Sequence, residues 1–288
     1  MMDFLINKTA SDSLIRNAIL EDMGAYGDIT SSYIFDEKSS SSGYIVCKEK
    51  NGAILCGIDI AETVFSLIDK NVKIKKIKKD SEKLNFMENV LEISGSTISL
   101  LNGERTALNF MQHLSGIATL TSKFALAAEK YNVKITETRK TLPGLRVLEK
   151  YAVRCGGGFN HRFGLFDGIL IKDNHIIAAG SVKEAIMRAR LHAPHTLKIE
   201  VEVKNSLELN EAVKSKADII MLDNMDLEEM TDSVKFIRKN LGNSCIIEAS
   251  GNVTLEKIDA ICKTGIDIIS TGKITNSAPS IDFSLELE

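Results

Sequence analysis

The 288-residue sequence lacks several features that would assign a protein to a common class. It has no excess of positive charge, since 36 lysines and arginines face 39 aspartates and glutamates and the net charge is −3. A chain without a global basic field has no general attraction for nucleic acid. No apolar run is long enough to cross a bilayer, and the N-terminal residues lack the apolar core of a signal peptide. We therefore expect a cytoplasmic protein that binds neither nucleic acid nor membranes.

Zinc and nucleotide motifs are also missing. The five cysteines form no C-x-x-C pair, and no histidine cluster has zinc spacing. An odd number of scattered cysteines fits reduced thiols in the cytosol. The glycine-rich stretch at 154–164 is neither a Walker A loop nor a dinucleotide fingerprint, because no strand precedes it and no Gly-Lys-Ser/Thr follows. At 44% hydrophobic residues, the chain can bury the core of one large domain or two moderate ones.

The first part of the chain, to about residue 103, reads as mixed α+β. Apolar spacing predicts helices at 11–23 and 58–69. Alternating residues and turn signals, including a turn at Asn51–Gly52, predict strands at 39–50, 51–57, 72–79, 89–94 and 96–101. Residues 104–130 read as a helix that is interrupted near Gly116.

The remainder alternates between strands and helices. Six apolar stretches each end in a reactive or small residue, and these are 134–140, 168–175, 198–203, 218–223, 245–250 and 267–272. Amphipathic helices are predicted at 181–193, 206–216, 226–240 and 254–265, each with a good N-cap residue. Strands joined by helices lie parallel, and a parallel β/α barrel presents its chemistry at the carboxyl ends of its strands.

Cations gather at the first of these strand ends. Arg139 and Lys140 follow one strand, and His161 and Arg162 follow the triple glycine. Arginine forks bind carboxylates in a bidentate manner, so we favour anion binding over a surface role for this group. Lys172 follows a short apolar run, and burial there would suit either a Schiff-base lysine or an anion-binding one.

Carboxylates and small residues occupy the other strand ends. Glu200 and Glu202 share one face of a strand, and Asp223 ends the next strand. Paired carboxylates on adjacent strands suit Mg²⁺ and sugar hydroxyls, although ion pairs with Lys172 or Arg139 are an alternative. The segments 247–252 and 269–273 place small residues where backbone amides can bind phosphate.

Arg105 is predicted near the start of a helix, where a cation opposes the helix dipole. It therefore either faces an anion, across a subunit interface, or pairs with Glu104 on the surface.

Taken together, these segments closely resemble the quinolinate phosphoribosyltransferase family, the carboxylating nicotinate-nucleotide pyrophosphorylases. The matching segments run in family order over almost the whole chain. They are EDMGAYGDIT, ERTALNFMQHLSGIATLT, TRKTLPGLRVLEKYAVRCGGGFNHRFGLFDGILIKDNH, EVEV, MLDN, EASGNVTLE and SAPSIDFSLEL.

The resemblance implies an N-terminal α/β sandwich domain at 1–110, joined by a C-terminal strand at 277–288, and an incomplete, seven-stranded α/β barrel of TIM-like type at 111–276. It implies a pentosyltransferase of NAD biosynthesis, which joins quinolinate to phosphoribosyl pyrophosphate. The products are nicotinate mononucleotide, pyrophosphate and CO₂, Mg²⁺ is required, and the enzyme is a homodimer or a higher homo-oligomer.

The resemblance also implies roles for individual residues. Substrates are bound by Arg105, Thr138, Arg139, Lys140, His161, Arg162, Lys172, Glu202, Asp223, Ser250, Gly251 and Gly272. Arg105 reaches a neighbouring subunit's site, and the last three form the cradle of the 5-phosphate. Lys140, Lys172, Glu202 and Asp223 are the catalytic group, and Glu202 and Asp223 also hold the metal.

Two positions depart from the family pattern. Asn252 stands where a second glycine usually follows EASG, and Asn276 stands where histidine is common. Asparagine tolerates positive φ, so the first turn can survive. Three alternatives remain open, namely a Schiff-base aldolase that uses Lys172, a related protein linked to molybdate transport, and a non-catalytic binding protein.

Overall fold

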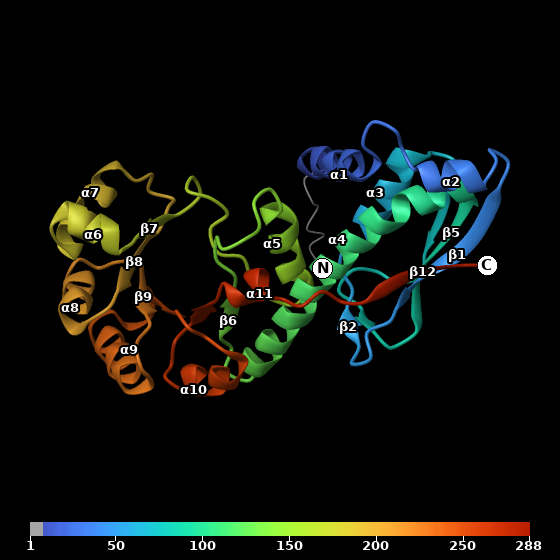
Figure 1. The fold of residues 1–288 in the computed structure, drawn as a ribbon. Helices are drawn as coiled ribbons and strands as arrows, with labels where there is room; N and C mark the ends of the chain where they lie inside the picture. The colour runs from blue at the N-terminus through green and yellow to red at the C-terminus, as the bar shows by residue number, and fades with distance from the viewer. Residues whose placement is uncertain (1–7) are drawn as a thin grey trace. The chain divides into compact units, whose positions relative to one another are not determined.

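The computed structural model describes residues 8–288, with side chains from residue 12 onward. The chain divides into two compact units (Figure 1). Of the described residues, unit 1 comprises 8–122, 142–157 and 277–288, and unit 2 comprises 123–141 and 158–276.

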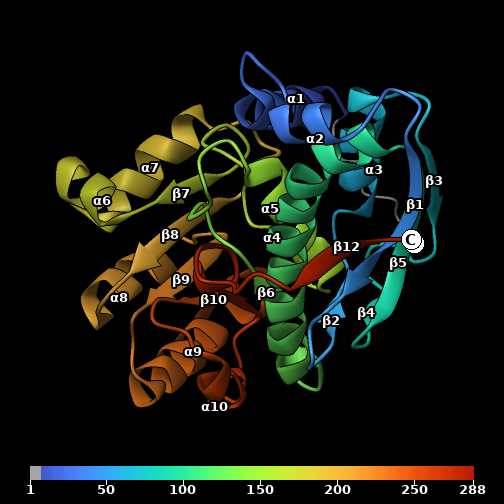
Figure 2. The same cartoon turned by 45° about the vertical axis from the view of Figure 1, so that its right-hand side comes forward.

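Unit 1 is built on an antiparallel sheet with the strand order β12-β1-β5-β3 (Figure 2). The strands are β1 (Ser40–Cys47), β3 (Lys73–Lys76), β5 (Glu88–Ser96) and β12 (Phe283–Leu287). The C-terminal strand β12 pairs with β1, with Cys47 opposite Phe283. The predicted helices at 11–23 and 58–69 are confirmed as α1 (Lys8–Met23) and α3 (Ile58–Ile68). A short helix, α2 (Ile29–Ile34), was not predicted, and Asp28 caps it.

Three expectations for unit 1 are wrong, namely the strand at 96–101, the helix break near Gly116 and the position of Arg105 near a helix start. Helix α4 runs without a break from Thr97 to Glu129, so residues 97–101 are helical and Arg105 lies well inside the helix. Gly116 does not interrupt α4, because its role is close packing: a Cβ atom there would lie 2.2 Å from the Pro279 carbonyl oxygen. The helix-dipole argument for Arg105 therefore fails.

The predicted turn at Asn51–Gly52 is confirmed between strands β1 and β2 (Ala53–Ile54), although these two strands do not pair with each other. Strand β2 pairs instead with β4 (Lys83–Leu84). Gly52 has a positive φ of 71°, so the chain turns at this point. The turn directs the chain to a more distant partner strand.

Unit 2 contains a parallel sheet in the order β6-β11-β10-β9-β8-β7. Its strands are β6 (Lys134–Thr136), β7 (Ile169–Ile171), β8 (Ile199–Val203), β9 (Ile219–Asp223), β10 (Ile246–Ser250) and β11 (Ile268–Ser270). The predicted α/β class with parallel strands is confirmed. Of the seven expected strands, the seventh is reduced among the described residues to one bridge between Thr136 and Phe159. The adjoining glycines explain this, because glycine weakens strands.

Helices connect the strands of unit 2 and lie outside the sheet (Figure 1). They are α6 (Asp173–Ala179), α7 (Val182–His192), α8 (Ser206–Lys214), α9 (Leu227–Leu241) and α10 (Ile258–Cys262). Helix α11 (Lys273–Asn276) follows the last strand, β11. Short 3-10 turns of unit 2 occur at Gly242–Ser244 and Leu255–Lys257. Helix α5 (Arg146–Cys155) lies between β6 and β7 in the sequence but belongs to unit 1.

The predicted caps are partly right. Ser181 caps α7, and Asp226 caps α9 in a capping box with Glu229. Asn205 caps α8 in place of the expected Ser206, while Thr254 makes no side-chain cap. Within residues 8–288, no helix combines the length and apolarity needed to cross a bilayer.

Candidate active site

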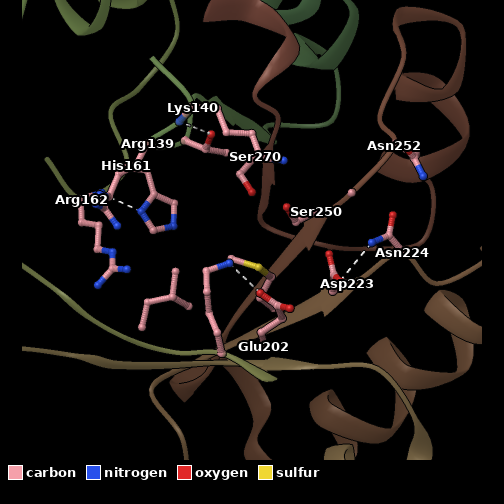
Figure 3. A pocket seen from close by; sticks show the side chains of 15 residues that line it. Arg139, Lys140, His161, Arg162, Glu202, Asp223, Asn224, Ser250, Asn252 and Ser270 are labelled. Carbon is pink, nitrogen blue, oxygen red and sulfur yellow. Dashed lines mark hydrogen bonds and ion pairs between the residues drawn. The ribbon is translucent and has the colours of Figure 1, made fainter. Parts of the chain in front are cut away.

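The carboxyl ends of the unit 2 strands surround a pocket of about 550 Å³ (Figure 3). Most of the predicted site residues line it. They are Thr138, Arg139, Lys140, His161, Arg162, Lys172, Glu202, Asp223, Ser250 and Gly251. Leu170, Met221, Asn224, Asn252 and Ser270 complete the lining. The strand-end pattern in the sequence therefore identified residues that converge in space.

Arg139 and Arg162 place two guanidinium groups on the same side of the pocket (Figure 3). Arg162 donates from Nη1 to the Gly168 carbonyl at 2.9 Å. Burial, and then the positive charge of Arg139, lower the pKa of Arg162. Two cations that disfavour each other are stabilised when an anion lies between them. This part of the pocket is therefore suited to an anionic ligand.

His161 lies above two buried carboxylates. Its Nε2 is 3.3 Å from Glu200 and 3.5 Å from Glu248. Burial disfavours the imidazolium, but hydrogen bonding to Glu200 and then Glu248 outweighs it and raises the pKa of His161. The Arg162 amide donates to Nδ1 at 2.7 Å, a contact that Nδ1 can accept only when it carries no proton.

Burial of the two carboxylates that contact His161 costs free energy. Glu200 and Glu248 are only 5% and 2% exposed. Within the described residues, Oε1 of Glu200 lacks a hydrogen-bond partner, and Oε1 of Glu248 has the long 3.5 Å contact with His161 Nε2. Burial and the nearby Glu248 raise the pKa of Glu200, while His161 opposes the rise. The sequence showed that Glu200 faces inward, but not that it pairs with His161.

On the other side of the pocket, Lys172 Nζ lies 2.8 Å from Glu202 Oε2. The Lys172 side chain is 47% exposed, whereas that of Glu202 is 8% exposed. The burial expected for Lys172 is therefore wrong, and with it the main argument for a Schiff-base lysine. The ion pair with Glu202, which the sequence left as an alternative, is present.

Asp223 ends strand β9, next to strand β8, which carries Glu202. Asn224 donates from Nδ2 to Asp223 Oδ2 at 3.0 Å. These carboxylates supply oxygen donors of the kind that Mg²⁺ prefers, one from each of two neighbouring strands. Asn224 had no role in the sequence-based prediction, although it directly follows the predicted Asp223.

Small residues form the remaining edge of the pocket. Gly251 has a φ of 87°, and a Cβ atom there would lie 2.2 Å from Asn224 Oδ1. Asn252 adopts a positive φ of 28°, so the expected tolerance of asparagine at this turn is confirmed. Gly272 packs against Lys140, whose Cδ would lie 2.7 Å from a Cβ atom.

Arg105 lies exposed on α4 in unit 1 and is not among the residues that line this pocket. Asn276 is exposed at the end of α11. The buried Ser270 was predicted only as part of the segment 269–273. It ends β11, and its hydroxyl has no hydrogen-bond partner within the described residues. Its position at a strand end was the available signal.

Comparison with family models gives two matches that together span most of the chain. Residues 28–115 match the N-terminal domain, and residues 117–286 the C-terminal domain, of quinolinate phosphoribosyl transferase. The chain belongs to the quinolinate phosphoribosyltransferase family.

Relatives of this family align over nearly the full chain. A probable nicotinate-nucleotide pyrophosphorylase (carboxylating) of Bacillus subtilis is 44% identical over 98% of this chain and 95% of its own length. Quinolinate phosphoribosyltransferase (decarboxylating) 1b of Nicotiana tabacum is 37% identical over 96% of this chain and 81% of its own length.

A solved structure supports the fold. The nicotinate-nucleotide pyrophosphorylase of Francisella tularensis has a TM-score of 0.90 and 41% identity, and the match covers 98% of this chain and 97% of that chain. The incomplete barrel with an N-terminal domain, expected from the resemblance, is thereby confirmed as the fold class of this quinolinate phosphoribosyltransferase family member.

Proposed function

We propose that the chain transfers the phosphoribosyl group of phosphoribosyl pyrophosphate to quinolinate, with loss of CO₂, and thereby forms nicotinate mononucleotide and pyrophosphate. The observation that carries the proposal is the division of one pocket into a cationic side, with Arg139 and Arg162, and a carboxylate side, with Glu202 and Asp223. Quinolinate carries two carboxylates, and the developing sugar cation needs negative charge. The pocket offers both environments at once.

The cationic side binds and orients quinolinate. Arginine forks can pair with both of its carboxylates, and pairing relieves the mutual repulsion of Arg139 and Arg162. Held in this way, the pyridine nitrogen faces the anomeric carbon. The ring becomes a pyridinium when the nitrogen attacks, and this electron sink allows the adjacent carboxylate to leave as CO₂.

The carboxylate side stabilises the sugar. As pyrophosphate departs, the ribose becomes oxocarbenium-like, and Glu202 and Asp223 can offset its positive charge. Lys172, held by Glu202 at 2.8 Å, and Lys140 supply cations for the anionic groups. Ser250, Gly251 and Gly272 supply small residues near the place where the 5-phosphate would bind.

Magnesium fits the same side of the pocket. Glu202 and Asp223 would hold it together with substrate oxygens, a donor set that magnesium prefers. When bound, the metal neutralises charge on the leaving pyrophosphate.

The proposal also includes a cytoplasmic homo-oligomer. All five cysteines are free, as suits a reducing compartment. Arg105 is exposed on α4, so it is available to a second copy of the chain, whose pocket it would complete.

The test incubates the purified chain with quinolinate, phosphoribosyl pyrophosphate and Mg²⁺, and measures nicotinate mononucleotide and CO₂. A parallel reaction replaces quinolinate with nicotinate. Product from quinolinate alone, lost when EDTA is added, supports the proposal. Product from nicotinate, or none from either, contradicts it.

A further inference from the structure

A second cluster of reactive side chains lies within unit 1, apart from the residues of the pocket. Cys56, Asp80 and Cys155 bring ligand atoms within 4.8 Å of one another. Cys56 is fully buried, whereas Cys155 is partly exposed. The two sulfur atoms come from segments far apart in the sequence, the loop before α3 and the last residue of α5.

Both cysteines are held against the same helix, α4. Ser115 of α4 accepts from the Cys56 amide at 2.9 Å and donates to the Cys56 carbonyl at 3.1 Å. Gly156, which follows Cys155, packs so closely on α4 that a Cβ atom would lie 2.4 Å from the Ala118 carbonyl oxygen. Ser115 and Ala118 are three residues apart, so they lie on neighbouring positions of one helix face. The pair is therefore fixed by buried contacts.

Asp80 ties the same two segments together. Its carboxylate accepts from the amides of Gly57 and Ile58 at 3.0 and 3.1 Å, and from the Tyr151 hydroxyl at 2.8 Å. Tyr151 lies one helical turn before Cys155. Because these donors already engage the Asp80 oxygens, the cluster is better suited to chemistry between the two sulfurs than to holding a metal ion.

The sulfurs have unequal surroundings. A hydrogen bond from Cys56, with smaller contributions from Ser81 and Tyr151, lowers the pKa of the Cys155 thiol against the effect of burial. Burial raises the pKa of Cys56. Cys155 is thus the accessible sulfur that more readily becomes a thiolate, and Cys56 holds the proton beside it. An attacking cysteine next to a resolving one has this arrangement.

We propose that Cys56 and Cys155 form a thiol pair that hydrogen peroxide oxidises to an intramolecular disulfide. The Cys155 thiolate attacks one peroxide oxygen, the O–O bond breaks, and a sulfenic acid forms while the departing hydroxide takes up a proton as water. The Cys56 sulfur then attacks the Cys155 sulfur, the S–O bond breaks, and a second water leaves with the Cys56 proton. The disulfide links α5 to the loop before α3, and a thiol reductant reverses it.

The test treats the full-length, reduced protein with hydrogen peroxide and follows it by intact mass spectrometry, thiol titration and peptide mapping. We expect the loss of two hydrogens and of two of the five free thiols, with one peptide pair joined through Cys56 and Cys155. In Cys56→Ser, or in Cys56→Ala if that variant does not fold, Cys155 should accumulate as a sulfenic acid that dimedone labels. Cys155→Ser should lose the label and consume peroxide about tenfold more slowly.

Cys262→Ser is the matched control, because Cys262 is buried in unit 2 and belongs to neither side of the pair. In the Cys262→Ser variant, the crosslink between Cys56 and Cys155 should form at the wild-type rate. Two free thiols at Cys56 and Cys155 after treatment, irreversible oxidation of Cys155 without a crosslink, or a disulfide between other cysteines would each overturn the proposal. None of these readouts requires the proposed transferase activity, so the two can fail separately.

Discussion

His161 Nε2 lies 3.3 Å from Glu200 Oε2, and together with Glu248 this carboxylate raises the pKa of the imidazole above its ordinary value of 6.5. A group whose pKa is raised on folding adds stability below its unfolded pKa, and this contribution is lost as the pH rises through the folded pKa. The imidazolium should therefore persist above pH 6.5 and weaken only at higher pH.

The first prediction concerns this charge. Glu248→Gln removes one carboxylate from Nε2 and should lower the pKa of His161, so that a histidine NMR titration shifts to lower pH. Glu256→Gln changes an exposed carboxylate of the same unit and serves as control. An unchanged His161 titration in Glu248→Gln would show that Glu248 does not stabilise the charge.

The second prediction concerns Arg139. Arg139→Ala removes one of the two guanidinium groups on the cationic side, and quinolinate binding should weaken by about 2–5 kcal/mol. Isothermal titration with quinolinate measures the loss, and Arg188→Ala provides a control. Arg188 is 62% exposed and pairs with Glu184 four residues away, so its removal should change binding little. Equal affinities for the two variants would contradict the role of Arg139.

The ends of the unit 2 strands could be predicted because each apolar run carries a polar or small residue at or next to its end, as with Glu202 and Asp223. Parallel topology then forces these ends to one edge. The limits of α4 could not be predicted, because the segment 96–101 is too short for its periodicity to distinguish a strand from a helix. Gly116 was predicted to interrupt the helix. A glycine is needed there because the backbone packs closely against Pro279, which lies far along the chain. The contact of His161 with Glu200 and Glu248 likewise depends on residues that only tertiary structure brings together.

The third prediction tests the turn that Gly251 forms. Gly251→Ala should raise KM for phosphoribosyl pyrophosphate, because a methyl group would collide with Asn224 and displace it from Asp223. Steady-state kinetics measure the change, which we expect to be on the order of tenfold for a small displacement of substrate.

Gly265→Ala separates this collision from backbone strain. Gly265 also has a positive φ, of 92°, but its nearest neighbour would be Val234 at 3.4 Å, and it does not line the pocket. It should lose stability without a comparable change in KM. The same rise in KM for both variants would mean that strain, and not the contact with Asn224, explains the result.

The fourth prediction concerns the pair of Lys172 and Glu202. Glu202→Gln removes the negative charge proposed to stabilise the sugar cation, so kcat should fall by about 10²–10³-fold with a smaller change in the affinity for quinolinate. Single-turnover measurements separate chemistry from binding. A fall in affinity alone, with kcat unchanged, would assign Glu202 to binding and contradict its proposed action in the transition state.

The last prediction concerns Arg105, which is exposed on α4 and does not line the pocket of unit 2. If a second copy of the chain receives this arginine, Arg105→Ala and Lys172→Ala should each be nearly inactive. Mixed oligomers of the two variants should then regain activity, because a mutant chain of one kind can lend its intact Arg105 to a pocket with an intact Lys172. Native mass spectrometry verifies subunit exchange, and a mixture of Lys172→Ala with Glu202→Gln is the control, since both lesions lie in the same pocket, where an exchange of arginines repairs neither. Absence of recovery in verified mixed oligomers would place the action of Arg105 outside a shared site.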